Sequence, residues 1–125
     1  MPYTIMIVDD SAVMRKILER SLRQTRVPIA AVVEAGDGAE ALQKLREDGG
    51  IQVIFSDVNM PNMDGLEFLK QVKDSEQFKQ LPVVMVTTEG AESKVLQALA
   101  LGATGYIRKP FTSVQMEQAL DKFLN

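Results

Sequence analysis

The sequence predicts an α/β fold, a doubly wound, five-stranded parallel sheet with five helices. Two observations lead to this prediction. Short runs rich in β-branched residues alternate with segments whose apolar residues recur at helical spacing. Most of the short runs are nearly continuous in apolar residues, which is typical of strands covered on both faces. Five such strand–helix pairs use residues 1–125, so we expect a single domain with no room for an output domain.

The strands and helices can be placed in order along the chain. The strands are expected at residues 3–8, 29–34, 51–55, 82–87 and 104–108. The helical stripes are expected at residues 13–22, 41–45, 66–72, 95–99 and 116–123. Right-handed crossovers between parallel strands leave few topologies, and in such sheets function lies beyond the carboxyl ends of the strands.

The helix boundaries carry signals of their own. Ser11, or Asp10 before it, is suited to cap the first helix, and Asp64 the third. Gly102 follows the fourth helix, where a left-handed residue commonly ends a helix. The run "TSVQ" (112–115) fits a capping box that opens the last helix.

The composition excludes several classes of function. The chain contains neither cysteine nor histidine, so disulfides, thiolate chemistry, histidine-based triads and typical zinc sites are excluded. A net charge of -3 argues against nucleic-acid binding. The N-terminus lacks the pattern of a signal peptide, and no apolar run approaches the roughly 18 residues of a membrane span. We therefore expect a cytoplasmic protein that contacts neither membrane nor nucleic acid.

Charged and hydroxyl side chains follow four of the predicted strands. Asp9 and Asp10 follow the first strand, Asp57 the third and Lys109 the fifth, while Thr87 ends the fourth. In the common doubly wound order 2-1-3-4-5, the three carboxylates converge in one pocket, with Thr87 and Lys109 on its far wall. Like charges about 4 Å apart repel by roughly 4 kcal/mol at an effective dielectric near 20. The pocket therefore calls for a cation, and Mg²⁺, or alternatively Mn²⁺, suits carboxylate ligands.

Taken singly, each of these residues has a plain structural explanation. Asp9 and Asp10 could cap a helix, Asp57 could form a turn, and Lys109 could be a solvated surface lysine. Their joint placement at separate strand ends favours a functional site instead. A carboxylate beside a metal, a lysine and a hydroxyl is an arrangement suited to phosphoryl transfer through an acyl phosphate.

Four motifs resemble the receiver domain of two-component response regulators over essentially the full chain. They are "VDDS" (8–11), "SDVNMPNMDG" (56–65), "MVTTE" (85–89) and "GATGYIRKPF" (102–111). The chain is most similar to CheY-like, single-domain chemotaxis regulators. The strand order 2-1-3-4-5 is known for this family and does not follow from the sequence alone. The resemblance also implies a cis peptide bond at Lys109–Pro110.

The resemblance assigns roles around the acidic pocket. It implies that Asp57 is the phosphoacceptor for a histidine kinase, a phosphotransfer protein or a small donor. Asp10 would ligate Mg²⁺ directly, Asp9 through water, and Asn59 through its backbone carbonyl. Lys109 would pair with the phosphoryl group. Such a protein is not expected to be an enzyme beyond its own phosphorylation and dephosphorylation.

The resemblance also implies a switch and an output surface. Thr87 would hydrogen-bond the phosphoryl group, and Tyr106 would turn inward as Thr87 moves. The output surface would be the fourth helix, fifth strand and fifth helix, including Val95 and Lys122. Its target would be a flagellar switch or another effector, bound by a monomer. Glu92 lies where flagellar-switch binders tend to carry basic residues, and Val58 where chemotaxis members often carry an aromatic one.

Three other functions can be compared with the residues of this pocket. A stand-alone phosphorelay intermediate would use the same residues. An aspartyl-phosphate phosphatase of the haloacid dehalogenase class needs an acid two residues after its nucleophile, where this chain has Asn59. A flavin-binding module would need a loop rich in glycine and hydroxyls after the first strand, whereas "DDSAVMR" (9–15) would repel a phosphate.

Overall fold

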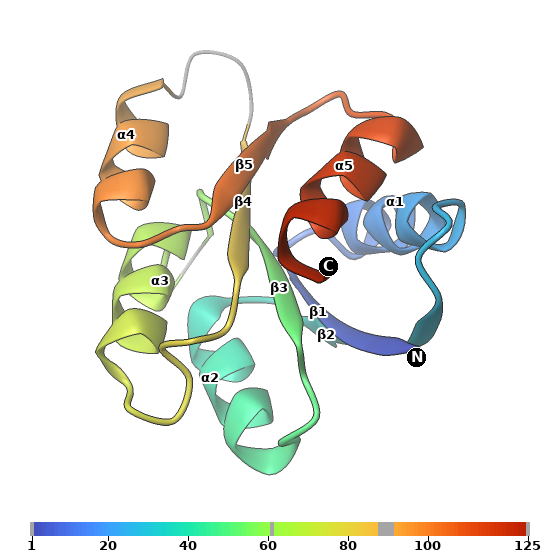
Figure 1. Cartoon of the computed structure of the whole chain (residues 1–125). Coiled ribbons are helices and arrows are strands. Elements are labelled where there is room, and N and C mark those ends of the chain that lie inside the picture. Colours follow the sequence, from blue (N-terminus) through green and yellow to red (C-terminus); the bar gives the residue numbers. More distant parts are fainter. Residues whose placement is uncertain (1, 61, 88–91, 125) are drawn as a thin grey trace.

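The structure is a computed structural model that describes residues 2–60, 62–87 and 92–124. Strands and helices alternate throughout (Figure 1). In chain order the elements are β1 (Tyr3–Val8), α1 (Ala12–Arg23), β2 (Ile29–Ala35), α2 (Gly38–Glu47), β3 (Val53–Asp57), α3 (Gly65–Asp74), β4 (Val83–Thr87), α4 (Glu92–Ala100), β5 (Gly105–Arg108) and α5 (Ser113–Leu124). None of the helices described here is long and apolar enough to cross a membrane.

The five strands form one parallel sheet in the order β2-β1-β3-β4-β5. This confirms the predicted fold class and strand order. The chain starts at β1, next to the edge of the sheet, adds β2 as the edge strand, and then crosses back past β1 to add β3, β4 and β5. The order therefore reverses between β1 and β3, which is the switch point where such folds place their sites.

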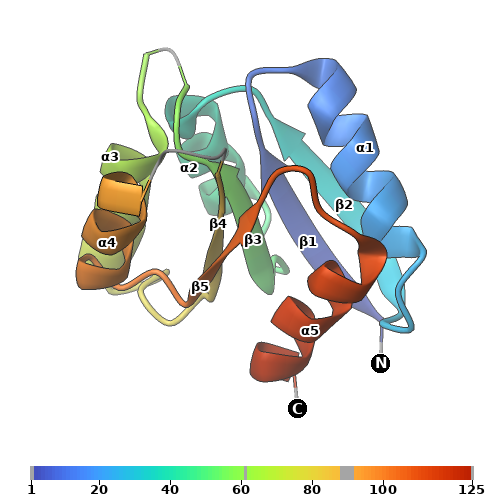
Figure 2. The same cartoon turned by 90° about the horizontal axis from the view of Figure 1, so that it is seen from above.

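Two helical layers cover the sheet. Figures 1 and 2 show α1 and α5 on one face and α2, α3 and α4 on the other. Each face has its own apolar core: Phe55, Leu18 and Leu120 pack on the side of α1 and α5, and Phe68 and Met85 pack on the opposite side. Alternate residues of the central strands enter opposite cores, which explains their nearly continuous apolar sequence.

The third strand lies two residues later than predicted. It was expected at residues 51–55, but pairing with β1 begins at Val53, opposite Ile5. Ile51 is buried in the core without belonging to the strand, so its hydrophobicity reflects burial and not strand pairing. As a consequence, Asp57 is the last residue of β3, whereas the predicted strand ended two residues before it.

The predicted helix caps are present. Ser11 is the N-cap of α1, since its hydroxyl accepts a hydrogen bond from Met14 N at 3.1 Å, and Asp64 caps α3. Thr112 and Gln115 form the expected reciprocal capping box before α5. These local signals fix where α1, α3 and α5 begin relative to the carboxyl ends of the strands.

The C-terminal end of α4 is closed at Gly102. This residue has φ +106°, and its N–H donates to Leu99 O, while Ala103 N donates to Ala98 O. The two hydrogen bonds form a Schellman motif, which glycine permits because it has no Cβ to clash in the left-handed region. The motif turns the chain from α4 directly into β5.

Candidate functional site

Three carboxylates lie together at the carboxyl ends of β1 and β3. The parallel register pairs Val8 with Ser56, so the next residues, Asp9 and Asp57, leave the two neighbouring strands side by side. Ligand oxygens of Asp9, Asp10 and Asp57 all lie within 4.8 Å of one another. The convergence predicted from the strand ends is therefore present, and its cause is the switch point between β1 and β3.

Lys109 brings a positive charge to this cluster. Its Nζ lies 3.4 Å from Asp9 Oδ2 and 3.8 Å from Asp57 Oδ2. Its backbone N–H donates to Thr87 O at 2.6 Å, which ties the loop after β5 to the end of β4. The peptide bond from Lys109 to Pro110 is cis, as the family resemblance implied. The lysine is therefore brought to the carboxylates by a loop that is anchored to the sheet.

Asp9 is the most deeply buried carboxylate of the three, with 1% of the residue exposed. Its Oδ1 accepts a hydrogen bond from Ser11 N at 2.9 Å. Arg15 holds its backbone, because the guanidinium donates through Nη1 to Asp9 O and through Nε to Glu34 Oε1. This role of Arg15 was not predicted, because an arginine on an amphipathic helix gives no local signal of such a contact.

The environment of Asp57 disfavours its charged form. Burial raises the pKa of this carboxyl group, and the neighbouring Asp9 raises it further. The Lys109 ammonium and the backbone N–H groups of Val58 and Asn59 act in the opposite direction but do not cancel the effect of burial. Three carboxylates share one nearby lysine, so a divalent cation with a preference for oxygen ligands fits the donor set.

Thr87 presents a buried hydroxyl at the end of β4. The residue is 2% exposed, and Oγ1 has no hydrogen-bond partner within residues 2–60, 62–87 and 92–124. Buried polar groups are nearly always paired, so an unpaired hydroxyl beside a candidate site is informative. β4 pairs with β3, with Val86 opposite Asp57, which places Thr87 one residue beyond the level of the carboxylate.

Gly65 allows α3 to start against the loop that follows Asp57. Its N–H donates to Val58 O at 2.8 Å. A Cβ built on Gly65 would lie 2.1 Å from the backbone oxygen of Asp57, which is far inside van der Waals contact. From the sequence, only the start of a helix was predicted here. The structure shows that this glycine also permits close approach of the helix to the backbone of Asp57.

The loop after β3 separates its residues into two environments. Val58 is buried in the core under α2 and α3, whereas Asn59 is exposed and accepts a hydrogen bond from Lys94 of α4 at its side-chain oxygen. Lys94 was not predicted to approach the site. Glu89, the last residue of the "MVTTE" motif, lies outside the described part of the chain, and so does the side chain of Glu92.

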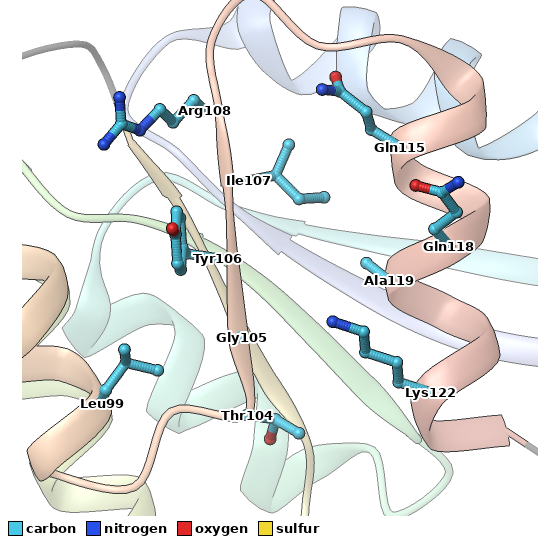
Figure 3. A pocket seen from close by; sticks show the side chains of 10 residues that line it. All are labelled: Leu99, Thr104, Gly105, Tyr106, Ile107, Arg108, Gln115, Gln118, Ala119 and Lys122. Carbon is cyan, nitrogen blue, oxygen red and sulfur yellow. The ribbon is translucent and has the colours of Figure 1, made fainter.

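A second concave region lies along β5, away from the carboxylates. A groove of about 800 Å³ lies around β5. In Figure 3, Ile107 points from the strand toward α5, whereas Tyr106 and Arg108 point to the opposite side of the strand. Tyr106 is 46% exposed, so its ring lies outward in this structure. The lining residues are Leu99, Thr104, Gly105, Tyr106, Ile107, Arg108, Gln115, Gln118, Ala119 and Lys122. Polar and apolar side chains are mixed, as at a surface that binds another protein.

The fold and the acidic cluster at its switch point define a CheY-like α/β domain. The model of the response regulator receiver domain matches residues 5–121, and the chain belongs to that family. The Chemotaxis protein CheY1 of Helicobacter pylori (strain ATCC 700392 / 26695) is 39% identical over 120 residues, covering 96% of this chain and 95% of the relative. A CheY homologue of Campylobacter jejuni is also 39% identical, with 96% and 91% covered.

Solved structures agree with this assignment. The chemotaxis response regulator CheY4 of Vibrio cholerae superposes with a TM-score of 0.84 at 36% identity, covering 98% of this chain and 99% of that one. A putative response regulator from Chloroflexus aurantiacus superposes with a TM-score of 0.89 at 31% identity, covering 99% and 98%. The likeness therefore extends over the whole domain and is not confined to the acidic motifs.

Proposed function

We propose that this chain is a two-component response regulator that accepts a phosphoryl group on Asp57 from a histidine kinase or phosphotransfer protein. The observation that carries the proposal is the meeting of Asp9, Asp10 and Asp57 with Lys109 at the switch point of the sheet. A structural turn has no need for three carboxylates and a lysine from three separate strand ends. A receiver needs all of them in one place.

In the proposed reaction, an oxygen of the Asp57 carboxylate attacks the phosphorus of the donor. A new bond forms between that oxygen and phosphorus, while the bond from phosphorus to the donor's nitrogen or oxygen breaks, and the donor leaves with the electron pair. Asp57 is partly accessible to such a donor, with 12% of its side chain exposed. Val58 N donates to Asp57 Oδ1 at 2.8 Å and thereby orients the carboxylate.

Asp10, Asp57 and the backbone carbonyl of Asn59 would hold Mg²⁺ or Mn²⁺, with Asp9 acting through water. When bound, the cation would offset the negative charge of the carboxylates and of the incoming phosphoryl oxygens. Lys109 lies within 4 Å of two of the three carboxylates and is placed to pair with a phosphoryl oxygen on Asp57. Its charge supplies part of the same neutralisation without a metal.

Thr87 and Tyr106 form the proposed switch. The unpaired hydroxyl of Thr87 is available to donate to a phosphoryl oxygen, and Tyr106 would turn inward as Thr87 moves. Hydrogen bonds to charged groups contribute about 1.5–3 kcal/mol each, so Thr87 and Lys109 together supply roughly 3–6 kcal/mol. Reversing a population from 1:99 to 99:1 needs about 5.5 kcal/mol, which lies near the upper end of that range.

We further propose that the groove along β5, together with α4 and α5, is the output surface. The curated relatives are named as chemotaxis proteins, which favours a chemotaxis role in the cytoplasm and a target such as a flagellar switch. Residues 1–125 would act as a single monomeric receiver domain without enzymatic turnover of other substrates. The same site would also serve a stand-alone phosphorelay intermediate, which differs only in passing the phosphoryl group onward.

Intact mass spectrometry tests the assignment. With acetyl phosphate and Mg²⁺, the protein should gain one phosphoryl group that hydroxylamine removes, and Asp57→Asn should gain none. Labelling of Asp57→Asn, or no labelling under conditions where a known receiver is labelled, would exclude Asp57 as the acceptor. Steady release of phosphate from unrelated phosphoesters would instead favour the phosphatase.

A further inference from the structure

Lys94 makes a contact that joins α4 to the phosphoacceptor loop. Its Nζ donates a hydrogen bond to Asn59 Oδ1, across a separation of 35 residues in the sequence. Within the described part of the chain, Lys94 has no carboxylate within salt-bridge distance. Its side chain is partly buried, unlike that of a fully solvated surface lysine. The observed partner of this ammonium is therefore a neutral amide next to the site.

Asn59 in turn touches Asp57 through its main chain. Its backbone N–H is one of two that stabilise the charged form of Asp57, the other being that of Val58. Val58 is fixed by burial in the core, whereas Asn59 is exposed. Its described side-chain anchor is Lys94. The position of one donor at the carboxylate thus depends on a side chain from α4.

We propose that Lys94 is a positioning residue, which holds Asn59 beside Asp57 so that water reaches the phosphoryl group less readily and the group is retained longer. This inference rests on the proposed phosphorylation of Asp57. Loss of the phosphoryl group is hydrolysis: a water oxygen attacks phosphorus, the bond from phosphorus to the Asp57 oxygen breaks, and the carboxylate leaves with the electron pair while a water proton passes to solvent. If Asn59 were released from Lys94, that water would reach the phosphorus more readily.

The rate of dephosphorylation tests the inference. The protein is labelled with radiolabelled acetyl phosphate and Mg²⁺, the donor is removed, and loss of label from the protein is followed with time. Lys94→Met keeps the apolar stem but removes the donor, and we expect its first-order rate constant to rise about threefold or more, as for loss of one partly exposed hydrogen bond. Lys94→Arg keeps a donor and should decay at nearly the rate of the unmodified sequence.

Two further variants separate positioning from a general effect of charge. Lys70→Gln removes a positive charge from an exposed position on α3. The side chain of Lys70 makes no hydrogen bond or ion pair with the described residues, so this variant should leave the rate unchanged. In an Asn59→Ala background, Lys94→Met should add no further change, because the group that Lys94 holds is already gone. Thermal unfolding of each variant confirms that it is folded.

The outcomes distinguish this inference from the function on which it rests. If the unmodified sequence is not labelled on Asp57, both fail. If it is labelled but Lys94→Met decays at the same rate, or Lys70→Gln accelerates decay as much, only the role of Lys94 is excluded. An undiminished effect of Lys94→Met in the Asn59→Ala background would likewise exclude action through Asn59.

Discussion

The carboxyl edge of the sheet and the groove along β5 are built in opposite ways. At the edge, Asp9 and Thr87 are 1% and 2% exposed, and the polar groups are positioned by backbone contacts from several strands. Along the groove, Tyr106 is 46% and Leu99 42% exposed. Phosphoryl transfer needs fixed groups whose charges are kept from water, whereas docking needs an accessible, partly apolar surface. The same sheet supplies both, because β5 lines the groove and the loop after it carries Lys109 to the carboxylates.

If the carboxyl edge of the sheet is rigid, a side chain added against its backbone should cause the largest loss of stability. Gly65→Ala is expected to destabilise the protein by about 3 kcal/mol or more, because its Cβ would lie 2.1 Å from Asp57 O and either β3 or α3 would have to shift. Urea denaturation gives the change in unfolding free energy. Gly49→Ala is the matched control, since a Cβ there meets nothing within 4 Å. Equal stabilities for the two variants would contradict the proposed close packing.

Removing the ammonium group of Lys109 from the carboxylates should strongly slow the phosphorylation of Asp57. Lys109→Ala is expected to slow labelling of Asp57 by acetyl phosphate about 10- to 100-fold, which corresponds to the loss of one charged hydrogen bond in the transition state. Initial rates of phosphoprotein formation at saturating Mg²⁺ measure the effect. A labelling rate within about twofold of the parent would show that Lys109 serves only to balance the resting carboxylates.

The charge of Asp57 should lower the stability of the resting protein. Its pKa is raised in the folded state, so the ionised carboxylate opposes folding at neutral pH, and this cost disappears as the pH falls through the folded pKa. Asp57→Asn should therefore raise Tm at pH 7 by a few degrees, about 1 kcal/mol in a domain of this size.

The difference in Tm between Asp57→Asn and the parent should become smaller as the pH falls. It should be absent below the ordinary pKa of an aspartate. Thermal scans of both proteins between neutral and acidic pH provide the comparison. A constant difference across this range would mean that the charge of Asp57 is not the cause.

A change on the groove should have the smallest effect on folding. Lys122→Ala removes an exposed side chain from α5 and is expected to change the unfolding free energy by no more than about 0.5 kcal/mol, with labelling of Asp57 unaffected. The variant should differ from the parent only when a protein target is bound. A slower labelling rate would show that a change in the groove affects the reactivity of Asp57 at the carboxyl edge of the sheet.

Much of this molecule follows from short-range patterns in the sequence. The alternation of β-rich runs and helical stripes was sufficient to predict the α/β class. Strands that are buried on both faces of a parallel sheet must be nearly continuous in apolar residues, and this pattern is easily recognised. Ser11, Asp64 and Gly102 were identified as caps because each acts on backbone groups within a few residues. The carboxylates of the site were found because parallel strands end at one edge.

Other features were decided only by the tertiary structure. The limits of β3 depend on its neighbours in the sheet: pairing with β1 begins at Val53, and pairing with Val86 of β4 includes Asp57 in the strand. Gly65 lies against the backbone of Asp57, and Lys94 reaches Asn59, only because α3 and α4 pack over the same loop. Such contacts depend on the relative placement of elements distant in the chain. This placement cannot be inferred from a residue's neighbours in the sequence. The contacts of Gly65 and Lys94 could therefore not be predicted from their local sequence.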